Sequence, residues 1–180
     1  MQSELDILRD VTRKLSVAEI AHMLTGSVAM NYYTRPRMTR DIDIVVSLHR
    51  KDVDTIVNLF ANDYYVDRNA VSRAIDNESL FNLIHNEAVI KVDCIIRKKS
   101  EYRHLEFERR KEVEIEGIKV WIVSKEDLII SKLYWARDSH SEFQLSDVKN
   151  LLASGYDGEY LERWTRKLNL HDLLNECLHE

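Results

Sequence analysis

The sequence predicts an α+β fold, in which a mixed β-sheet flanked by helices forms a core and a C-terminal helical bundle follows it. Strand-like and helix-like segments are mixed up to residue 123, whereas only helical periodicity follows Ser124. Four glycines and one proline punctuate the chain, so connections should be short. We therefore expect a core over 1–123 and a helical region packed on it over 124–180, with a single domain as the alternative.

The first half of the chain supplies most of the expected core. Residues 3–15 place apolar side chains on one helical face. A short apolar strand over 18–24 ends at Gly26, and a helix follows over 27–33. Residues 41–46 are rich in β-branched side chains, which favours a strand, and residues 51–61 have helical spacing.

The second half begins with strands and ends with helices. Strands are expected over 80–85 and 88–96, and residues 112–123 alternate around Glu116-Gly117, which indicates a hairpin. Ser124 and Asp127 resemble a capping box at the start of a helix. Helical spacing then predicts helices over 125–137, 141–153, 157–167 and 170–178.

Composition restricts the class of protein. A chain of 180 residues can bury about 70% of its unfolded surface, so it needs no disulfide. Cys94 and Cys177 match no metal-binding spacing, and we expect a reduced protein. No apolar stretch approaches the ~20 residues of a membrane span, and the N-terminus lacks a signal-peptide pattern. We therefore expect a soluble, cytoplasmic protein with no membrane partner.

The charge is uneven along the chain. The net charge of −5 argues against a protein that coats nucleic acid. Residues 97–111, however, hold seven Lys or Arg and three Glu. This stretch is either a patch for a phosphate-bearing partner or a solvated loop and strand edge.

Two aspartates stand one residue apart in the expected strand over 41–46. Alternate strand residues point to one face, so Asp41 and Asp43 should project together while Ile42 faces the core. Adjacent carboxylates repel unless a positive charge lies between them, and hard oxygen ligands suit Mg²⁺ or Mn²⁺. The alternative is an exposed strand whose carboxylates pair with Arg37 and Arg40.

Gly26-Ser27 precedes this pair by 14 residues. Glycine permits close approach of the backbone to a ligand, and a helix N-terminus binds phosphate oxygens. The Ser27 hydroxyl could add a further contact. Alone, the dipeptide is also typical of a turn with a helix cap. Together with the aspartates it predicts a phosphate site beside a metal.

A third carboxylate, Asp93, lies in the strand-like stretch "VIKVDCII". It can complete a metal site or accept a proton from an attacking hydroxyl, although a lone Asp can also be a cap or an ion-pair partner. Asn82, in the preceding strand, could contact a base or ribose.

The ordered set of G-S, D-x-D and a separate strand Asp resembles the nucleotidyltransferase superfamily with a DNA-polymerase-β-like fold. More closely, the chain resembles AbiEii-like nucleotidyltransferases of toxin–antitoxin and abortive-infection systems. The stretches that carry this are Gly26-Ser27, "RMTRDIDIVV" (37–46), "LFNLIH", "KVDCII" and "EDLIISKLYWARDSHSEFQLSDVKNLL" (126–152). The resemblance covers about residues 15–153, and the large C-terminal domain of longer AbiEii-like toxins is missing.

The resemblance implies a role for two residues of the helical region. Lys132 would bind a triphosphate oxygen, and Asp147 would orient Lys132 or the acceptor. From the residues alone, Lys132 could equally be a surface lysine. If it binds triphosphate, its removal should weaken NTP binding and cost little stability. Asp147 could be solvated or paired with Lys149 or Arg137.

The function predicted is therefore metal-dependent transfer of a nucleoside monophosphate from an NTP to an acceptor hydroxyl, with release of pyrophosphate. Asp41, Asp43 and Asp93 would hold Mg²⁺ or Mn²⁺. Arg37 and Thr39 are further candidates for NTP contacts if the strand starts early, or else belong to an exposed turn. The acceptor stays open among RNA, a small molecule and a protein side chain. The alternative is a non-catalytic nucleotide-binding or partner-binding module, with an antitoxin-like partner.

Overall fold

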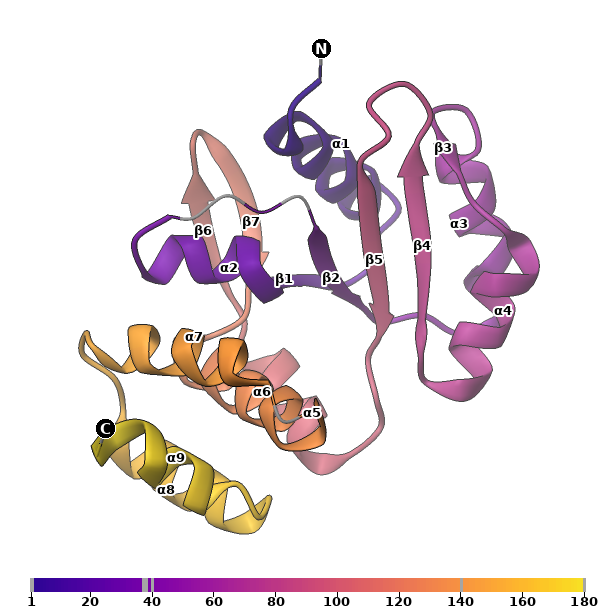
Figure 1. The fold of residues 1–180 in the computed structure, drawn as a ribbon. Helices are drawn as coiled ribbons and strands as arrows, with labels where there is room; N and C mark the ends of the chain where they lie inside the picture. Colours follow the sequence, from indigo (N-terminus) through magenta and orange to yellow (C-terminus); the bar gives the residue numbers. More distant parts are fainter. Residues whose placement is uncertain (1, 37–38, 40, 140, 180) are drawn as a thin grey trace. The chain divides into compact units, whose positions relative to one another are not determined.

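A computed structural model describes residues 2–36, 39, 41–139 and 141–179 (Figure 1). They fall into two compact units. Unit 1 comprises the described residues of Met1–Ala29 and Arg37–Val123, and unit 2 those of Met30–Pro36 and Ser124–Glu180. Helix α2 (Gly26–Tyr33) contributes its first turn to unit 1 and the rest to unit 2. Whether 124–180 is a separate domain stays a prediction.

Unit 1 is built on a mixed sheet. Among the described residues the sheet has seven strands in the order β3-β4-β5-β2-β1-β7-β6. Strand β2 runs parallel to β5 and antiparallel to β1, and β1 is parallel to β7. The strands are β1 (His22–Thr25), β2 (Ile42–Val46), β3 (Tyr64–Tyr65), β4 (Leu80–His85), β5 (Lys91–Ile96), β6 (Lys111–Ile115) and β7 (Ile118–Ile122).

Alternation along the central strands separates a core face from a polar face. Ile42, Ile44 and Val46 of β2 are buried, and the residues between them are only half-buried. The same alternation holds in β4 and β5, so one face of these strands joins the hydrophobic core. The other face carries Asp43, Asn82 and Asp93, which the register places in one row.

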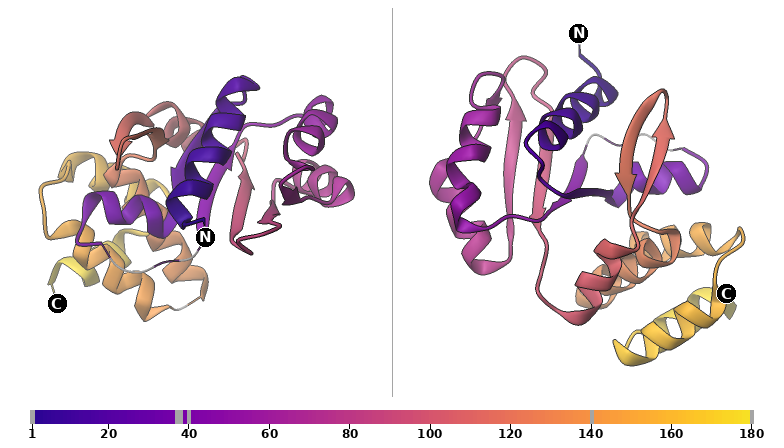
Figure 2. Two further views of the ribbon diagram at one scale, coloured as in Figure 1. Left: turned by 90° about the horizontal axis from the view of Figure 1, so that it is seen from above. Right: turned by 180° about the vertical axis from the view of Figure 1, so that it is seen from behind.

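The helices of unit 1 accompany this sheet. In Figures 1 and 2, α3 and α4 lie side by side next to β3 and β4. The helical elements other than α2 are α1 (Glu4–Val17), a 3-10 helix (Arg50–Asp52), α3 (Val53–Phe60), α4 (Arg68–Asn77) and α5 (Glu101–Glu108).

Unit 2 is helical apart from its turns and connections. Ser124 caps α6 as expected, since the Asp127 amide donates to Ser124 Oγ at 3.2 Å. Its helices besides the end of α2 are α6 (Lys125–Ser139), α7 (Glu142–Leu152), α8 (Gly158–Lys167) and α9 (His171–His179). The predicted α+β class, with a mixed sheet, flanking helices and a C-terminal helical bundle, is confirmed.

Several elements differ from the sequence prediction. Helix α1 extends to Val17, so β1 begins only at His22 rather than at residue 18. Strand β3 and helices α4 and α5 were not predicted. The two helices have polar sequences, and their capping residues Asp67 and Ser100 are the signals that could have located them.

The basic stretch 97–111 is neither a plain loop nor a free cationic surface. It contains α5 and the start of β6. Lys99 pairs with Glu78 at 3.6 Å, and Arg103 pairs with Glu106 at 2.9 Å. Arg97 and Arg110 both lie over the Phe107 ring. Several basic side chains of the stretch 97–111 therefore interact with other groups of unit 1 rather than with solvent alone.

Within the described part of the chain, no helix combines the length and the apolar character that crossing a membrane requires. Cys94 and Cys177 are both buried free thiols.

Candidate active site

Asp43 and Asp93 lie opposite each other on neighbouring parallel strands. The register of β2 and β5 pairs Asp43 with Asp93, and that of β4 and β5 pairs Asn82 with Asp93. Neighbouring strands are about 4.8 Å apart, so the side chains of this row share one small area of the sheet. Both carboxylates are half-buried, which strengthens their electrostatic interaction with any cation nearby.

Asp41 flanks this row from just outside the strand. Strand β2 begins at Ile42, not at residue 41 as predicted, and the Asp41 side chain is 66% exposed. Its Oδ1 atom lies 4.0 Å from Lys91 Nζ. Asp41 is thus linked to the Asp93 neighbourhood through Lys91.

Lys91 is a site residue that the sequence prediction missed. Its Nζ atom donates to Asp93 Oδ2 at 3.0 Å. That hydrogen bond raises the pKa of Lys91, and the charges of Asp93, Asp41 and Asp43 raise it further against the opposing effect of burial. The spacing K-x-D in a strand was the available signal, since residues two apart share a face.

Asn82 contacts the third carboxylate directly. Its side-chain amide donates a hydrogen bond to Asp93 Oδ1. The row register explains this, because Asn82 is the direct cross-strand neighbour of Asp93. Asn82 therefore fixes the orientation of the third carboxylate. A contact of Asn82 with a base or ribose stays a prediction.

Gly26 makes room for Asp43. A Cβ atom on Gly26 would lie 2.1 Å from Asp43 Oδ2, far inside van der Waals contact. The φ angle of Gly26 is +66°, in the left-handed region that favours glycine. Gly26 opens α2, and half-buried Ser27 follows it. The start of a helix thus lies against one of the carboxylates.

Arg37 and Thr39 are two further predicted NTP contacts, and Arg37 lies outside the described residues. Thr39 is half-buried but does not belong to β2, which starts three residues later. The strand does not start early, so Thr39 does not alternate with Asp41 on a strand face.

Lys132 and Asp147 form a buried ion pair in unit 2. Lys132 Nζ lies 2.6 Å from Asp147 Oδ2, and both side chains are less than 10% exposed. Gln144 Oε1 also accepts from Lys132 Nζ, at 3.2 Å. The interpretation of Lys132 as a surface lysine is therefore wrong, and so is that of Asp147 as a solvated residue.

Asp43, Asp93 and the flanking Asp41, together called the carboxylate row, suit a divalent cation by their donor chemistry. Asp41, Asp43 and Asp93 offer hard oxygen atoms, and the missing side chain of Gly26 gives the Asp43 carboxylate the space it occupies. Within the described ranges, however, no three His, Cys, Asp or Glu side chains are gathered closely enough to hold a metal ion. The ammonium group of Lys91 lies among the carboxylates instead.

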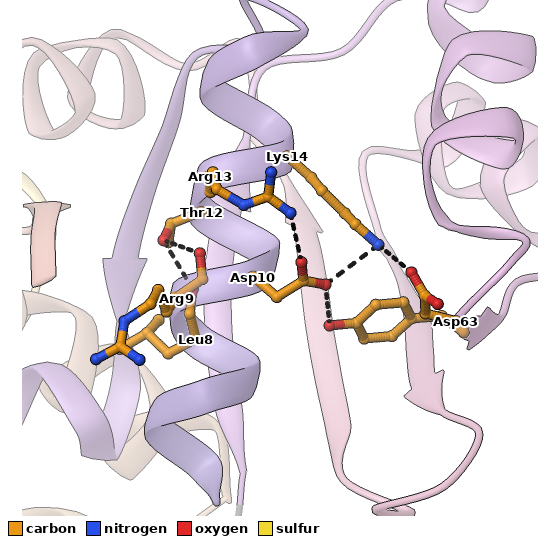
Figure 3. Close-up of polar contacts among 8 residues, drawn as sticks. Leu8, Arg9, Asp10, Thr12, Arg13, Lys14 and Asp63 are labelled. Atoms are coloured by element: carbon orange, nitrogen blue, oxygen red, sulfur yellow. Dashed lines mark hydrogen bonds and ion pairs between the residues drawn. The ribbon is translucent and has the colours of Figure 1, made fainter. Parts of the chain in front are cut away.

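A pocket of about 380 Å³ lies elsewhere in unit 1 and includes none of the predicted site residues. Asp10 and Asp63 line it, and Figure 3 shows Lys14 reaching both. Lys14 Nζ lies 3.2 Å from Asp10 and 2.6 Å from Asp63. These carboxylates are already neutralised, which makes this pocket a weaker candidate than the row on the sheet.

Comparisons with known proteins identify the fold. No protein-family model matches the sequence, and no curated protein is similar to it. Among solved structures, the antibiotic-resistance factor ANT(2'')-Ia has a TM-score of 0.63 at 15% identity, covering 98% of both chains. The lincosamide antibiotic adenylyltransferase LnuA has a TM-score of 0.54 at 16% identity, covering 83% of this chain and 96% of its own.

A further similar structure is an antigenic nucleotidyltransferase-like protein from Paracoccidioides brasiliensis. Its TM-score is 0.55 at 18% identity, and the match covers 96% of this chain and 92% of that protein. At such identities the likeness is one of fold. The chain therefore has the fold of the nucleotidyltransferases.

Proposed function

We propose that this chain is a metal-dependent nucleotidyltransferase, which moves a nucleoside monophosphate from an NTP to an acceptor hydroxyl and releases pyrophosphate. The observation that carries the proposal is the pairing of Asp43 with Asp93 on parallel strands, beside a helix that opens with Gly26. The fold supports it, because similar structures include an adenylyltransferase and ANT(2'')-Ia in complex with adenylyl-2''-tobramycin.

Each part of the site would have its own task. Asp41, Asp43 and Asp93 would hold Mg²⁺ or Mn²⁺, which when bound neutralises charge on the phosphates. The N–H groups at the start of α2 and the Ser27 hydroxyl would bind phosphate oxygens. Arg37 and Thr39 remain proposed NTP contacts.

In the chemical step, Asp93 accepts the proton of the acceptor hydroxyl. The acceptor oxygen then forms a bond to the α-phosphorus while the bond from that phosphorus to the α,β-bridging oxygen breaks. Pyrophosphate leaves with that electron pair. Lys132 would bind a triphosphate oxygen through its ammonium group, and Asp147 would orient it.

The acceptor and the biological setting are finer parts of the proposal. RNA, a small molecule and a protein side chain all present suitable hydroxyl groups. An AbiEii-like toxin with an antitoxin partner is the setting that the sequence resemblance favours. If this holds, expression of the chain arrests growth and the Asp43→Asn variant does not.

Label transfer tests the activity. Each NTP labelled at the α-phosphate is incubated with Mg²⁺ or Mn²⁺ and with RNA, protein or small-molecule fractions. We expect wild type to transfer label to one fraction and Asp43→Asn to transfer none, because the amide keeps the shape but removes the charge that holds the metal. Equal transfer by both proteins would contradict the proposal.

The non-catalytic alternative predicts another outcome of the same experiment. A nucleotide-binding module would retain NTP on the protein without transferring label to any fraction. A module that recognises only a partner protein would not bind NTP at all.

A further inference from the structure

Lys91 lies among the three candidate metal ligands. Its Nζ atom is 3.0 Å from Asp93 Oδ2 and 4.0 Å from Asp41 Oδ1. It stands two residues before Asp93 on β5, so both side chains project from the same face of the sheet. The ammonium group therefore occupies the neighbourhood in which a cation would bridge these carboxylates.

Protein donors already engage both oxygen atoms of Asp93. The amide of Asn82 donates to Oδ1, and Lys91 donates to Oδ2. An amide is neutral and leaves a lone pair of Oδ1 for another ligand. The ammonium, in contrast, carries a full positive charge that repels a divalent cation at this distance. Of the two donors, only Lys91 competes electrostatically with a metal.

We infer that Lys91 is a tethered counter-ion, which neutralises the carboxylate row in the metal-free protein and leaves when a divalent cation binds. The inference rests on the proposed function, since it assigns the row to a metal. It makes Lys91 a residue that sets metal affinity, and it accounts for the fact that the described carboxylates are not gathered for a metal in this conformation.

The surroundings of Lys91 permit such a movement. Its side chain is 43% exposed, so the ammonium can swing into water on its flexible stem without being left unsolvated. Lys132 makes a useful contrast. Its side chain is only 6% exposed and is paired with the equally buried Asp147, so it could not leave in this way.

Binding of Mn²⁺ in the absence of nucleotide tests the inference. The free Mn²⁺ signal in electron paramagnetic resonance is measured for wild type, Lys91→Met, Lys91→Arg and Lys98→Met. Methionine keeps the length and removes the charge, and arginine keeps the charge. Lys98 is an exposed lysine just beyond β5 and serves as the matched control.

We expect Lys91→Met to bind Mn²⁺ about 2- to 5-fold more tightly than wild type, the scale of a partly exposed ion pair. Lys91→Arg and Lys98→Met should bind like wild type. Without metal, Lys91→Met should melt at a lower temperature than Lys98→Met, and Mn²⁺ should raise its melting temperature more. If Lys91→Met does not fold, Lys91→Gln serves in its place.

Two failures are distinguishable. If wild type binds Mn²⁺ and Lys91→Met binds it equally or more weakly, the counter-ion inference is overturned and the metal site stands. If neither protein binds Mn²⁺, the counter-ion inference fails, and Mn²⁺ binding in the presence of NTP then decides the proposed metal-dependent function separately.

Discussion

A missing side chain makes room for Asp43. Gly26 combines a left-handed φ of +66° with a backbone position that no Cβ can share with Asp43 Oδ2. The glycine was identified from sequence as a phosphate-binding feature, and the structure gives it a second reason. Its position against Asp43 could not be predicted, because that contact depends on the pairing of Thr25 with Asp43 across β1 and β2.

Gly26→Ala should therefore damage the site as well as the fold. Alanine at a positive φ costs about 1 kcal/mol of unfolding free energy, and the added Cβ must also displace the Asp43 carboxylate. We expect lower stability in urea and loss of Mn²⁺ binding. Gly117→Ala is the matched control, since Gly117 has a φ of +77° with nothing within 4 Å of the added Cβ. Retained Mn²⁺ binding in Gly26→Ala would contradict this role.

Asp10 is a second residue whose environment matters, because its neighbours lower the pKa of its carboxyl group. Burial acts to raise its pKa, but hydrogen bonds from Tyr64, Arg13 and Lys14 outweigh burial, and the net effect lowers the pKa (Figure 3). Because the pKa of Asp10 is lower in the folded state, its ionised carboxylate stabilises the protein at pH values above the unfolded-state pKa of about 3.9. This stability is lost as the pH falls through the lowered pKa.

Tyr64→Phe should raise the pKa of Asp10 toward its ordinary value. The variant removes the hydroxyl that donates to Asp10 Oδ2 at 2.9 Å. At pH 7 the free energy of unfolding should fall by about 1 kcal/mol, the usual net value of one hydrogen bond. Carboxyl NMR titration and urea unfolding measure the two effects. Tyr65→Phe, at an exposed neighbour, should change neither, and an unchanged Asp10 pKa in Tyr64→Phe would refute this account.

Among elements, helices α6 and α7 are joined by the ion pair of Lys132 and Asp147. Both charges are buried, so removing one leaves the other without its partner in a poorly solvated environment. We expected from the sequence that removal of Lys132 would cost little stability. The burial of the ion pair instead predicts a large cost.

Lys132→Ala should lower the free energy of unfolding by about 3–5 kcal/mol, the usual cost of breaking a buried ion pair. The double variant Lys132→Met/Asp147→Leu should recover most of that stability, because apolar groups can replace such a pair. If Lys132 also binds triphosphate, the double variant should still bind NTP about 10- to 150-fold more weakly than wild type. Normal NTP affinity in the stable double variant would leave the pair a structural role alone.

The elements that sequence predicted well are those with a strong pattern. The β6–β7 hairpin was placed by alternation around Glu116-Gly117, both of which have positive φ. Strands β2, β4 and β5 were placed by their apolar residues. Helices α4 and α5 were missed because their sequences are mostly polar. The contact of Asn82 with Asp93 was missed because strand register decides it, and register follows from the whole sheet. The contact of Lys91 with Asp93 lies within one strand, where the K-x-D spacing was the available signal.

At the scale of the whole molecule, the proposed metal ligands share one compact unit. Asp41, Asp43, Asp93, Gly26 and Lys91 all belong to unit 1. We propose that the carboxylates of this unit form one catalytic centre, in which Asp93 takes the acceptor proton. Substitution of Asp93 therefore tests this role directly.

The most direct measurement is pyrophosphate release under saturating NTP and Mg²⁺ by wild type, Asp93→Asn and Asp54→Asn. Asp54, an exposed carboxylate of α3, is the control. We predict that Asp93→Asn lowers turnover by about 100-fold or more, the scale of a lost general base, while NTP affinity falls far less. Asp54→Asn should match wild type. Turnover by Asp93→Asn equal to that of wild type would contradict the account.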